Sequence, residues 1–336
     1  MRRREVITLL GSAAAAWPFA AHAQVPQRMK RVALIHPATK AEDLRIGGDP
    51  NYTIMLEEIK RLGYVEVVNL IVDRYSAEGR FDRFPEIARN VVATRPDVIC
   101  AVSNALVLAL QSETRTIPIV GWTGDPVVAG IISSLAHPGG NITGVSIDAG
   151  PDLGAKRVEL FVEAVGKLAN ARVLDIPEVW KADSPYAKSM REAAKRANIP
   201  LELEPLQSPI NESEYKRAFA AMQRDHVDGV FISPSPDNYT HRVLLGRLAR
   251  EYKLPAISWF TDSTKAGALI SYAFNLEAAD RRIAAQTVEI LNGGNPAEMP
   301  FFLETHWELV INLKSAKELG LEIPAGLIAL TDRVIE

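Results

Sequence analysis

The 336-residue chain contains one phrase twice, and this repeat constrains its fold more than any other feature. Residues 116–125 read TIPIVGWTGD, and residues 253–262 read KLPAISWFTD. Aligned without gaps, the phrases match at a proline, a tryptophan and a final aspartate: Pro118 with Pro255, Trp122 with Trp259, and Asp125 with Asp262. A proline-led apolar run that ends in small and polar residues is typical of a buried parallel strand with a loop at its carboxyl end. The repeat predicts two similar α/β units, and the alternative is coincidence, because such strands are common in α/β proteins.

Strand and helix patterns alternate on both sides of the turn-rich residues 136–141. The expected strands lie at 31–35, 67–72, 97–102 and 117–120, then at 171–176, 201–206, 230–232, 255–259 and 268–271. Helical periodicity fills most of the intervals between them. This alternation predicts an α/β protein with two doubly wound parallel sheets, each covered by helices on both faces.

The first 23 residues have the three regions of an export signal. Arg2-Arg3-Arg4 is followed by an uncharged run, and Ala21-His22-Ala23 is a small-x-small cleavage site. Gly11, Ser12 and Pro18 interrupt the run, which disfavours the alternative of a membrane anchor. We expect cleavage near Ala23 and a periplasmic protein, with the twin-arginine and the general export routes both open.

Composition excludes several classes of protein. The net charge of −3, with Lys and Arg spread evenly, argues against a nucleic-acid partner. The single cysteine, Cys100, lies in an apolar run and is expected in the core, without a disulfide. The chain is long enough for two domains.

Motifs of catalysis and cofactor binding are absent from the sequence. It contains no G-x-S-x-G nucleophile elbow, no phosphate loop and no dinucleotide-binding glycine loop. No two histidines of the mature chain are spaced three or four residues apart, so helical metal-ligand spacing is also absent. We therefore expect no catalytic residues, no metal and no cofactor, although acid–base pairs formed by folding keep an exported enzyme as an alternative.

Ligands of open parallel sheets bind beyond the carboxyl ends of the strands. The polar and aromatic residues at these predicted ends are our candidate ligand-binding residues: His36, Thr39, Ser103, Asn104, Thr123, Asp125, Ser233, Ser235, Trp259, Phe260 and Tyr272. Each has a structural alternative. Ser103 and Asn104 are also suited to cap the next helix, Asp125 to cap a turn, and Trp259 to pack in a core. The candidates include no arginine that could pair with a carboxylate.

Several segments carry a resemblance to a known family. The segments are 61–66 (RLGYVE), 77–83 (AEGRFDR), 124–127 (GDPV), 134–144 (SLAHPGGNITG) and 308–321 (ELVINLKSAKELGL). They resemble the ABC-transporter substrate-binding proteins that include tryptophan- and tyrosine-uptake members, over nearly all of the mature chain. The resemblance implies the type I periplasmic binding fold, in which two lobes joined by a multi-strand hinge close on a ligand. It places residues 30–122 and about 273–304 in the first lobe and about 127–272 in the second, with 305–336 unassigned.

The chain departs from the family pattern at 36–39, 44–50 and 179–181, so its ligand can differ from the family's amino acids. The resemblance implies a monomeric solute-binding component of an ABC importer, which captures a small molecule and works with a permease in the inner membrane. An amino acid or an aromatic carboxylate is the expected ligand. A periplasmic sensor that reports to a membrane receptor remains an alternative, because it would use the same fold.

Overall fold

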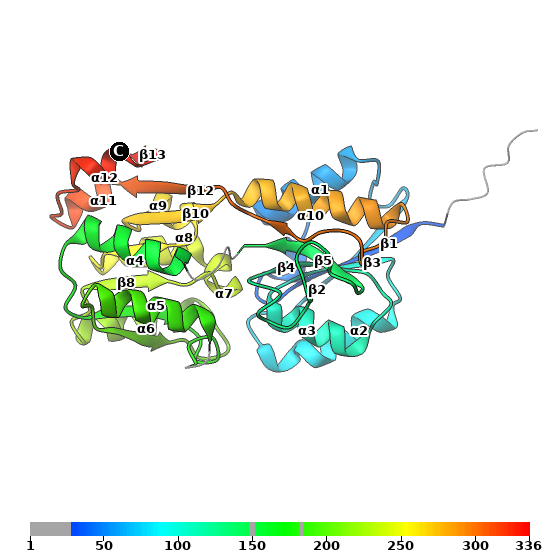
Figure 1. Cartoon of the computed structure of the whole chain (residues 1–336), viewed down its shortest axis with the longest axis horizontal. Coiled ribbons are helices and arrows are strands. Elements are labelled where there is room, and N and C mark those ends of the chain that lie inside the picture. The colour runs from blue at the N-terminus through cyan, green and yellow to red at the C-terminus, as the bar shows by residue number, and fades with distance from the viewer. Residues whose placement is uncertain (1–27, 148–151, 182–183) are drawn as a thin grey trace, which may run out of the picture.

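The chain folds into two α/β lobes that lie side by side (Figure 1). The computed structural model describes residues 28–147, 152–181 and 184–336. The predicted export signal lies outside the described residues. Each lobe is built on one sheet, and each sheet has a core on both of its faces.

The sheet of the first lobe has six strands in the order β11-β5-β4-β3-β1-β2, all paired in parallel. The strands are β1 (Lys30–His36), β2 (Leu70–Ser76), β3 (Val98–Val102), β4 (Ile119–Thr123), β5 (Ile142–Ser146) and β11 (Phe302–Leu303). Side chains alternate between the faces of a strand, so a strand that is apolar throughout contributes to two cores. In β1, Val32 and Leu34 pack in one core, while Ala33 and Ile35 pack in the other.

Helices cover both faces of this sheet (Figure 1). One face is covered by α1 (Pro50–Arg61) and α10 (Leu276–Leu291), and the other by α2 (Phe84–Ala93) and α3 (Asn104–Glu113). α10 comes from far along the chain and packs against α1. Cys100 faces the α10 side and is buried, as predicted, with its thiol 3.2 Å from the hydroxyl of Thr287.

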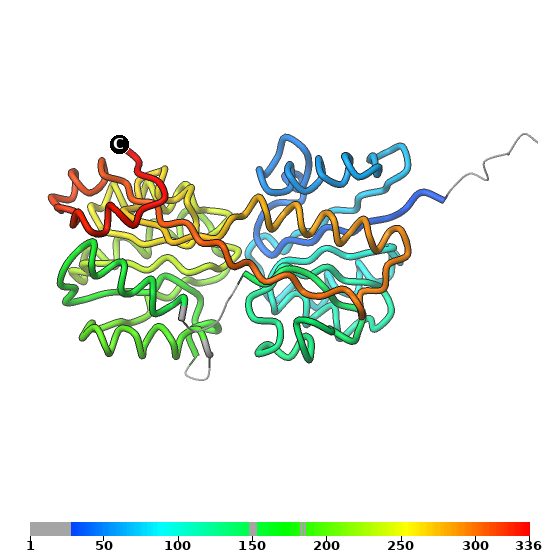
Figure 2. The backbone as a smooth tube through the Cα atoms, turned by 45° about the horizontal axis from the view of Figure 1, so that its top comes forward, coloured from blue at the N-terminus to red at the C-terminus, as the bar shows by residue number. Residues whose placement is uncertain are grey.

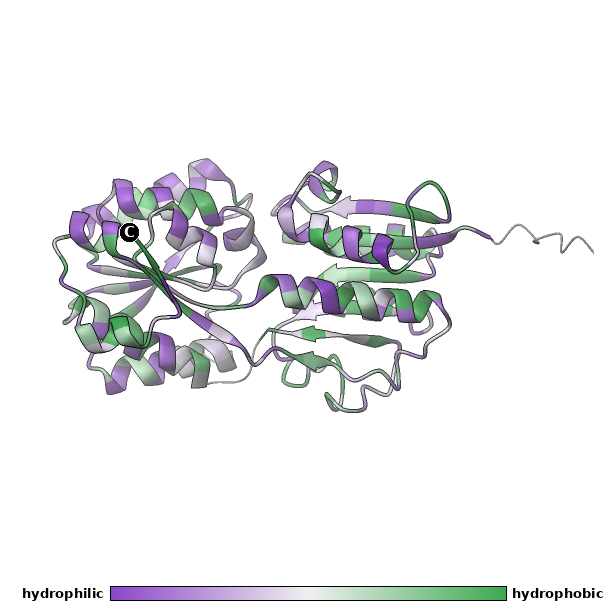
Figure 3. Cartoon of the chain, turned by 90° about the horizontal axis from the view of Figure 1, so that it is seen from above, coloured by the Kyte–Doolittle hydropathy of each residue, from purple (hydrophilic) through white to green (hydrophobic). Residues whose placement is uncertain are grey.

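The second sheet has seven strands in the order β13-β12-β10-β9-β8-β6-β7. They are β6 (Ala171–Asp175), β7 (Leu201–Pro205), β8 (Gly229–Ile232), β9 (Ala256–Ser258), β10 (Ile270–Phe274), β12 (Trp307–Asn312) and β13 (Arg333–Ile335). β12 is antiparallel to β10, and the other pairs are parallel. The helices are α4 (Asp152–Val165), α5 (Pro185–Arg196), α6 (Glu212–Arg224), α7 (Pro236–Thr240), α8 (Arg242–Glu251), α9 (Thr261–Ala266), α11 (Leu313–Glu318) and α12 (Ala325–Ala329). Figure 3 shows strands with many hydrophobic residues between helices that carry both hydrophilic and hydrophobic residues.

The repeated phrase marks equivalent strands of the two sheets. Its first copy contains β4, which lies between β3 and β5, and its second copy contains β9, which lies between β8 and β10. Trp122 is the next-to-last residue of β4, and Trp259 directly follows β9, so both lie at the carboxyl ends of these strands. The shared topology confirms two similar doubly wound lobes with mainly parallel sheets.

The lobe boundaries differ from those expected. Residues 127–147 belong to the first lobe, because β5 pairs in register with β4 from Ile142 to Ser146. The turn at 136–141 therefore leads into a further strand of the same sheet. The segment 305–336, unassigned from sequence, adds β12 and β13 to the second sheet.

The second strand also lies later than the expected 67–72, as β2 (Leu70–Ser76). Val67 has a positive φ of 70° and stands in a turn, where its side chain is 84 % exposed. Val67 and Val68 are apolar and continue into the apolar sequence of β2, which is why we expected them in the strand. They lie in the turn before β2.

The chain passes from the first lobe to the second after Ile147, returns between β10 and α10, and leaves again between β11 and β12 (Figure 2). Trp122 and Ile147 lie at this junction and pack against the cores of both lobes. The first lobe thus includes α10 and β11 from the later part of the chain.

Candidate ligand site between the lobes

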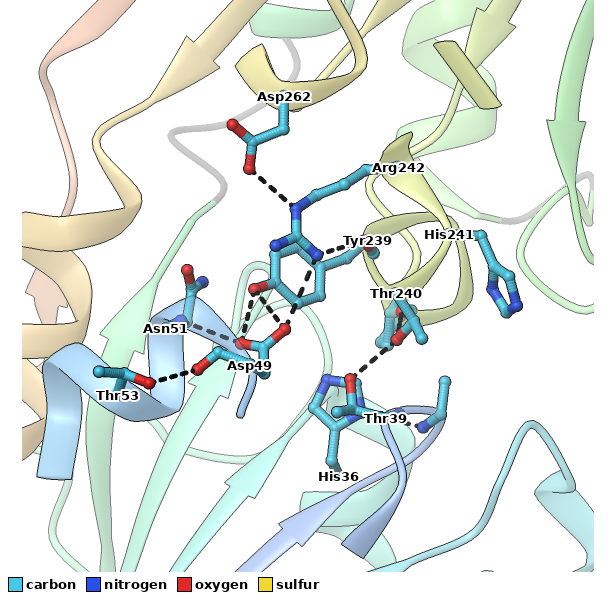
Figure 4. Close-up of polar contacts among 12 residues, drawn as sticks. His36, Thr39, Asp49, Asn51, Thr53, Tyr239, Thr240, His241, Arg242 and Asp262 are labelled. Carbon is cyan, nitrogen blue, oxygen red and sulfur yellow. Dashed lines mark hydrogen bonds and ion pairs between the residues drawn. The ribbon is translucent and has the colours of Figure 1, made fainter. Parts of the chain in front are cut away.

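The two lobes meet through a polar cluster centred on Asp49 (Figure 4). We call Asp49, Tyr239, Arg242 and Asp262 the interlobe cluster. Asp49 belongs to the first lobe, and the other three belong to the second. The hydroxyl of Tyr239 donates to the Asp49 carboxylate at 3.0 and 3.2 Å, and Nη1 of Arg242 lies 3.7 Å from the same carboxylate.

Asp49 is held in place by its own helix. It is the N-cap of α1, where its side chain accepts a hydrogen bond from the backbone N–H of Asn51 at 2.9 Å. Pro50 stands in the first turn, where its missing N–H costs nothing. An aspartate at this position is favoured both by the free backbone N–H groups and by the helix dipole. The local sequence therefore fixes a carboxylate that points toward the other lobe.

Arg242 is fixed from the side of the second lobe. Its Nε donates to Asp262 at 3.0 Å, its Nη1 donates to the carbonyl of Tyr239 at 2.9 Å, and its guanidinium lies 4.1 Å from the centre of the Tyr239 ring. The side chains of Arg242 and Asp49 are only 8 % and 9 % exposed. A charge pair this deeply buried requires good geometry, because each group has lost its water.

His36 and Thr39 add a second bridge beside the cluster. Thr39 and Thr240 bring their hydroxyls within 2.9 Å across the lobes. Nδ1 of His36 accepts hydrogen bonds from the backbone N–H groups of Ala38 and Thr39, at 3.0 and 2.7 Å. Burial, and then the charge of Arg242, lowers the pKa of His36 to about 3. His36 is therefore neutral at ordinary pH, with its proton on Nε2.

Three candidate residues make local contacts in the first lobe. Ser103 caps α3 by accepting from the N–H of Leu106, Asn104 accepts from the N–H of Gly124, and Asp125 accepts from the N–H groups of Val127 and Val128. The contacts of Ser103 and Asp125 are the capping contacts that we weighed as alternatives, whereas Asn104 bonds to the loop after β4 and does not cap α3. Their side chains set the shape of the loops after β3 and β4.

Three further candidates are polar residues with partners in their own lobe. Thr123 and Ser233 are 1 % and 0 % exposed. The Thr123 hydroxyl lies 3.5 Å from the carbonyl of Val145, and the Ser233 hydroxyl accepts from the amide of Asn238 at 2.9 Å. Ser235 caps the short helix α7.

Two of the aromatic candidates, Trp259 and Tyr272, lie around an arginine that the sequence did not indicate. Arg157 on α4 is 1 % exposed, and its guanidinium lies 4.1 Å from the ring centre of Trp259, 5.7 Å from Tyr272 and 4.9 Å from Trp307. It donates to the carbonyl of Tyr272. Phe260 is 2 % exposed, with its ring 5.4 Å from that of Tyr239.

The structure brings His36 and Thr39 to the contact between the lobes, together with four residues that we did not predict: Asp49, Tyr239, Arg242 and Asp262. Asp49 lies in the segment 44–50, which departs from the family pattern. The pair Asp49-Pro50 was the available signal, because an aspartate followed by a proline commonly begins a helix. Tyr239 and Arg242 had no comparable signal.

A small cavity of about 20 Å³ lies on the first-lobe side, between the carboxyl ends of β3 and β4 and the helices α1 and α10. Tyr52 and Met55, Trp122, and Asp280 and Ile283 are among its lining residues. Asp280 is 2 % exposed, and burial raises its pKa well above the usual value. Asp49 and Glu277 add to this effect, and Arg242 opposes it.

The chain has two α/β lobes with chain crossings between them, and the lobes meet near the carboxyl end of β1 and the start of α1. This arrangement defines the type I periplasmic binding protein fold. Solved structures share it. A conserved domain protein from Vibrio cholerae superimposes with a TM-score of 0.76 at 26 % identity, over 91 % of this chain and 100 % of that one. An ABC domain from Streptococcus pneumonia, in complex with L-Trp, gives a TM-score of 0.73 at 20 % identity, over 91 % and 99 %.

The chain belongs to the ABC transporter substrate binding protein family, whose model matches residues 48–335. It is also similar to the tyrosine-binding protein of Clostridioides difficile (strain R20291), with 24 % identity over 273 residues, which cover 80 % of this chain and 75 % of that protein. The resemblance seen in the sequence is thereby confirmed. In the part of the chain that the structure describes, no helix is long and apolar enough to span a membrane, and no group of three or more acidic, histidine or cysteine side chains is arranged to hold a metal ion.

Proposed function

We propose that this protein is the extracytoplasmic ligand-capturing component of an ABC importer, and that it binds an amino acid or an aromatic carboxylate between its lobes by hinge closure. The observation that carries the proposal is the interlobe cluster, in which Asp49 of one lobe is bound by Tyr239 and Arg242 of the other. A ligand that contacts both lobes would favour the state in which these groups meet. Membership of the substrate-binding family supports the same function.

The protein acts as a monomer that hands its ligand unchanged to a permease in the inner membrane. His36, Thr39 and the aromatic candidates Trp259, Phe260 and Tyr272 supply the predicted binding surface, together with Ser103, Asn104, Thr123, Asp125, Ser233 and Ser235. The export signal that ends near Ala23 directs the chain to the periplasm. The absence of catalytic motifs from the sequence supports a binding role, and recovery of an unmodified ligand would distinguish it from an enzyme.

Two measurements test this proposal. Native mass spectrometry of the protein purified from its own cells should identify a bound small molecule. Small-angle scattering of the protein stripped of that molecule should then give a larger radius of gyration than scattering of the same sample after the molecule is added back. An unchanged radius at saturation would contradict closure, and a chemically altered molecule would contradict the binding role.

A further inference from the structure

A second contact between the lobes is made by the segment after β2, which is one of the segments that carry the family resemblance. The carbonyl oxygen of Gly79 accepts a hydrogen bond from the hydroxyl of Ser208, in the second lobe, at 3.1 Å. Phe81 packs against a core of the first lobe and also against a core of the second. We call residues 77–81 the bridging loop, because they belong to the first lobe and contact the second.

The bridging loop covers a buried carboxylate of the second lobe. Asp237 lies in the first turn of α7, the short helix at the boundary between the lobes (Figure 1). It is 1 % exposed, and neither of its carboxylate oxygens has a hydrogen-bond partner among the residues that the structure describes. A methyl group added at Gly79 would lie only 3.2 Å from Oδ1 of Asp237 and 3.1 Å from the carbonyl oxygen of Ile210. The backbone of Gly79 therefore lies close against the carboxylate.

An ionised carboxylate is unfavourable in this place. A buried charge has lost its hydrogen bonds to water, and here no donor replaces them. The neutral acid loses much less on burial. Burial accordingly raises the pKa of Asp237 to about 7, against the opposing effect of its own backbone N–H.

The ionisable groups nearest to Asp237 do not compensate its charge. They are Asp175 at the end of β6, Tyr215 on α6 and His241 after α7 in the second lobe, and Glu78 and Arg80 on either side of Gly79 in the first. Asp175 is itself a buried acid, and its pKa is raised by burial and by the charge of Asp237. Burial lowers the pKa of His241, which favours its neutral form. Glu78 and Arg80 are exposed, so water weakens their effect.

α7 also contacts the groups on the other side of the interlobe boundary. Its residue Tyr239 bonds to Asp49, and the Tyr239 ring lies beside those of His36 and the guanidinium of Arg242. Arg242 is already paired with Asp49 and Asp262. The cation of the interlobe cluster is therefore engaged by other carboxylates.

We propose that closure of the lobes on a ligand is coupled to the uptake of a proton by Asp237, because the bridging loop covers this carboxylate only in the closed state. The inference rests on the proposed function, since it takes hinge closure as the mechanism of binding. When the lobes separate, Gly79 moves away from Asp237, water reaches the carboxylate, and the ionised form is stabilised. The closed state then holds a proton that the open state releases at a lower pH.

The sign of the pH effect follows from this difference. The pKa of Asp237 is higher in the closed state, so its contribution favours closure at low pH and is lost as pH rises to about 7. His36 acts in the opposite direction, because burial and the charge of Arg242 lower its pKa in the structure. The effect of Asp237 is therefore measured as a ratio between a variant and the wild-type protein at the same pH, in which the contribution of His36 cancels.

Asp237→Asn is the variant that isolates this effect, because it keeps the shape of the side chain and cannot ionise. Isothermal titration of the mature full-length protein with L-tyrosine, and then with L-tryptophan, gives the affinity at pH 5.5 and pH 8. The molecule identified by native mass spectrometry is the probe if neither amino acid binds. We expect Asp237→Asn to bind more tightly than the wild-type protein at pH 8. The ratio of the two affinities should rise by about five- to thirtyfold from pH 5.5 to pH 8.

Proton uptake is measured directly by repeating the titrations at pH 6.5 in phosphate and in imidazole, which have different heats of ionisation. The wild-type protein should take up between about a half and one proton more than Asp237→Asn. Asp237→Ser, which is neutral and smaller, should repeat both results. Asp82→Asn is the matched control, because it removes a carboxylate from the same part of the first lobe at a side chain that is 67 % exposed. Its affinity relative to the wild-type protein should be the same at both pH values.

The outcomes separate this coupling from the proposed function. An affinity ratio that stays constant between pH 5.5 and pH 8, or equal proton uptake by Asp237→Asn and the wild-type protein, would overturn the coupling while closure on a small molecule stands. Wild-type affinity that depends on Na⁺ or Ca²⁺ at constant pH, and no longer does so in Asp237→Asn, would place a cation on Asp237 and would also overturn it. Binding without a decrease in the radius of gyration would overturn both.

Discussion

The hydroxyl of Tyr239, on α7 of the second lobe, donates to the carboxylate of Asp49, which caps α1 of the first lobe, at 3.0 and 3.2 Å. The same carboxylate thus accepts a bond from its own helix and a bond from the other lobe. The bond from Asn51 lies within the first lobe. The bond from Tyr239 links the two lobes.

Tyr239→Phe therefore tests how much this contact favours closure. The change removes one hydroxyl and leaves the ring, the cap and Arg242 in place. A hydrogen bond to a charged group contributes about 1.5 kcal/mol or more, so ligand affinity should fall roughly tenfold while each lobe keeps its stability. Isothermal titration with the identified ligand measures this loss.

Tyr215→Phe is the control for Tyr239→Phe. The Tyr215 hydroxyl donates to Asn238 at 2.9 Å inside the second lobe, so it is buried without bridging the lobes. This variant should lower the free energy of unfolding by about 1 kcal/mol and leave affinity unchanged. Equal affinity losses in the two variants would show that the Asp49–Tyr239 bond has no specific role in closure.

Gly79 provides a steric test of the contact between the two lobes. It has a φ of +75°, and a Cβ added there would lie 3.1 Å from the carbonyl oxygen of Ile210 and 3.2 Å from Oδ1 of Asp237, both in the second lobe. Gly79→Ala should keep the lobes apart and weaken ligand binding by about tenfold, as expected for overpacking of 1–3 kcal/mol. Calorimetric titration gives the affinity, and small-angle scattering gives the mean size of the liganded protein.

Backbone strain must be separated from this steric effect. Gly130 has a nearly identical φ of +72°, but a Cβ there would meet no atom within 4 Å. Gly130→Ala should therefore share the cost of about 1–2 kcal/mol for an alanine in this conformation without any loss of affinity. If Gly130→Ala also weakens binding, the effect of Gly79→Ala is not steric.

Two buried carboxylates predict how stability depends on pH. Asp175 and Asp237 are 0 % and 1 % exposed, and burial raises the pKa of each to about 7. Asp237 raises the pKa of Asp175 further, whereas the N–H of Ile176 and the hydroxyl of Ser233 lower it. The folded protein thus holds protons that the unfolded chain releases near pH 4.

The sign follows from this proton difference. The free energy of unfolding should fall as pH rises from about 4 to about 7 and then level off, with each pKa unit worth about 1.4 kcal/mol. Denaturant titrations at pH 5.5 and pH 8 should show the difference. Asp237→Asn should flatten this dependence and raise stability at pH 8.

His36 acts in the opposite direction. Its pKa is lower in the folded protein than in the unfolded chain, so its contribution makes the free energy of unfolding fall as pH falls below 6.5. The comparison of Asp237→Asn with the wild-type protein at each pH cancels this contribution. An identical pH dependence in the two proteins would show that Asp237 is ionised throughout.

The sequence was informative where short-range physics decides the structure. Strands such as β1 could be predicted, because a strand that is buried on both faces has apolar residues at consecutive positions. In β1 these residues are Val32, Ala33, Leu34 and Ile35. The repeated phrase identified β4 and β9, since equivalent strands are buried in the same way. The boundary near residue 127 was misplaced because no local feature shows that β5 joins the sheet it follows.

The site was less predictable, because its residues come together only through tertiary structure. His36 and Thr39 follow a recognisable strand and could be proposed. Tyr239 and Arg242 lie on helices, where their spacing resembles that of any surface helix, and they meet Asp49 from 190 or more positions away. Arg157 and Asp280 are charged residues inside helices, and nothing in the sequence distinguishes them from solvent-exposed ones.

Phe260, matched to Thr123 by the repeated phrase, remains the sharpest test of the predicted binding surface. Its side chain is 2 % exposed and packs in the core of the second lobe, with its ring edge-on to Tyr239. Phe260→Ala should therefore lower the free energy of unfolding by about 3–5 kcal/mol, and should weaken binding mainly by loosening Tyr239. Tyr272→Ala is the comparison, because Tyr272 is half-buried and stacks on Trp307. Melting temperature and affinity are measured for both, and a Phe260→Ala variant that keeps its stability but loses its ligand would place Phe260 in the binding surface and not in the core.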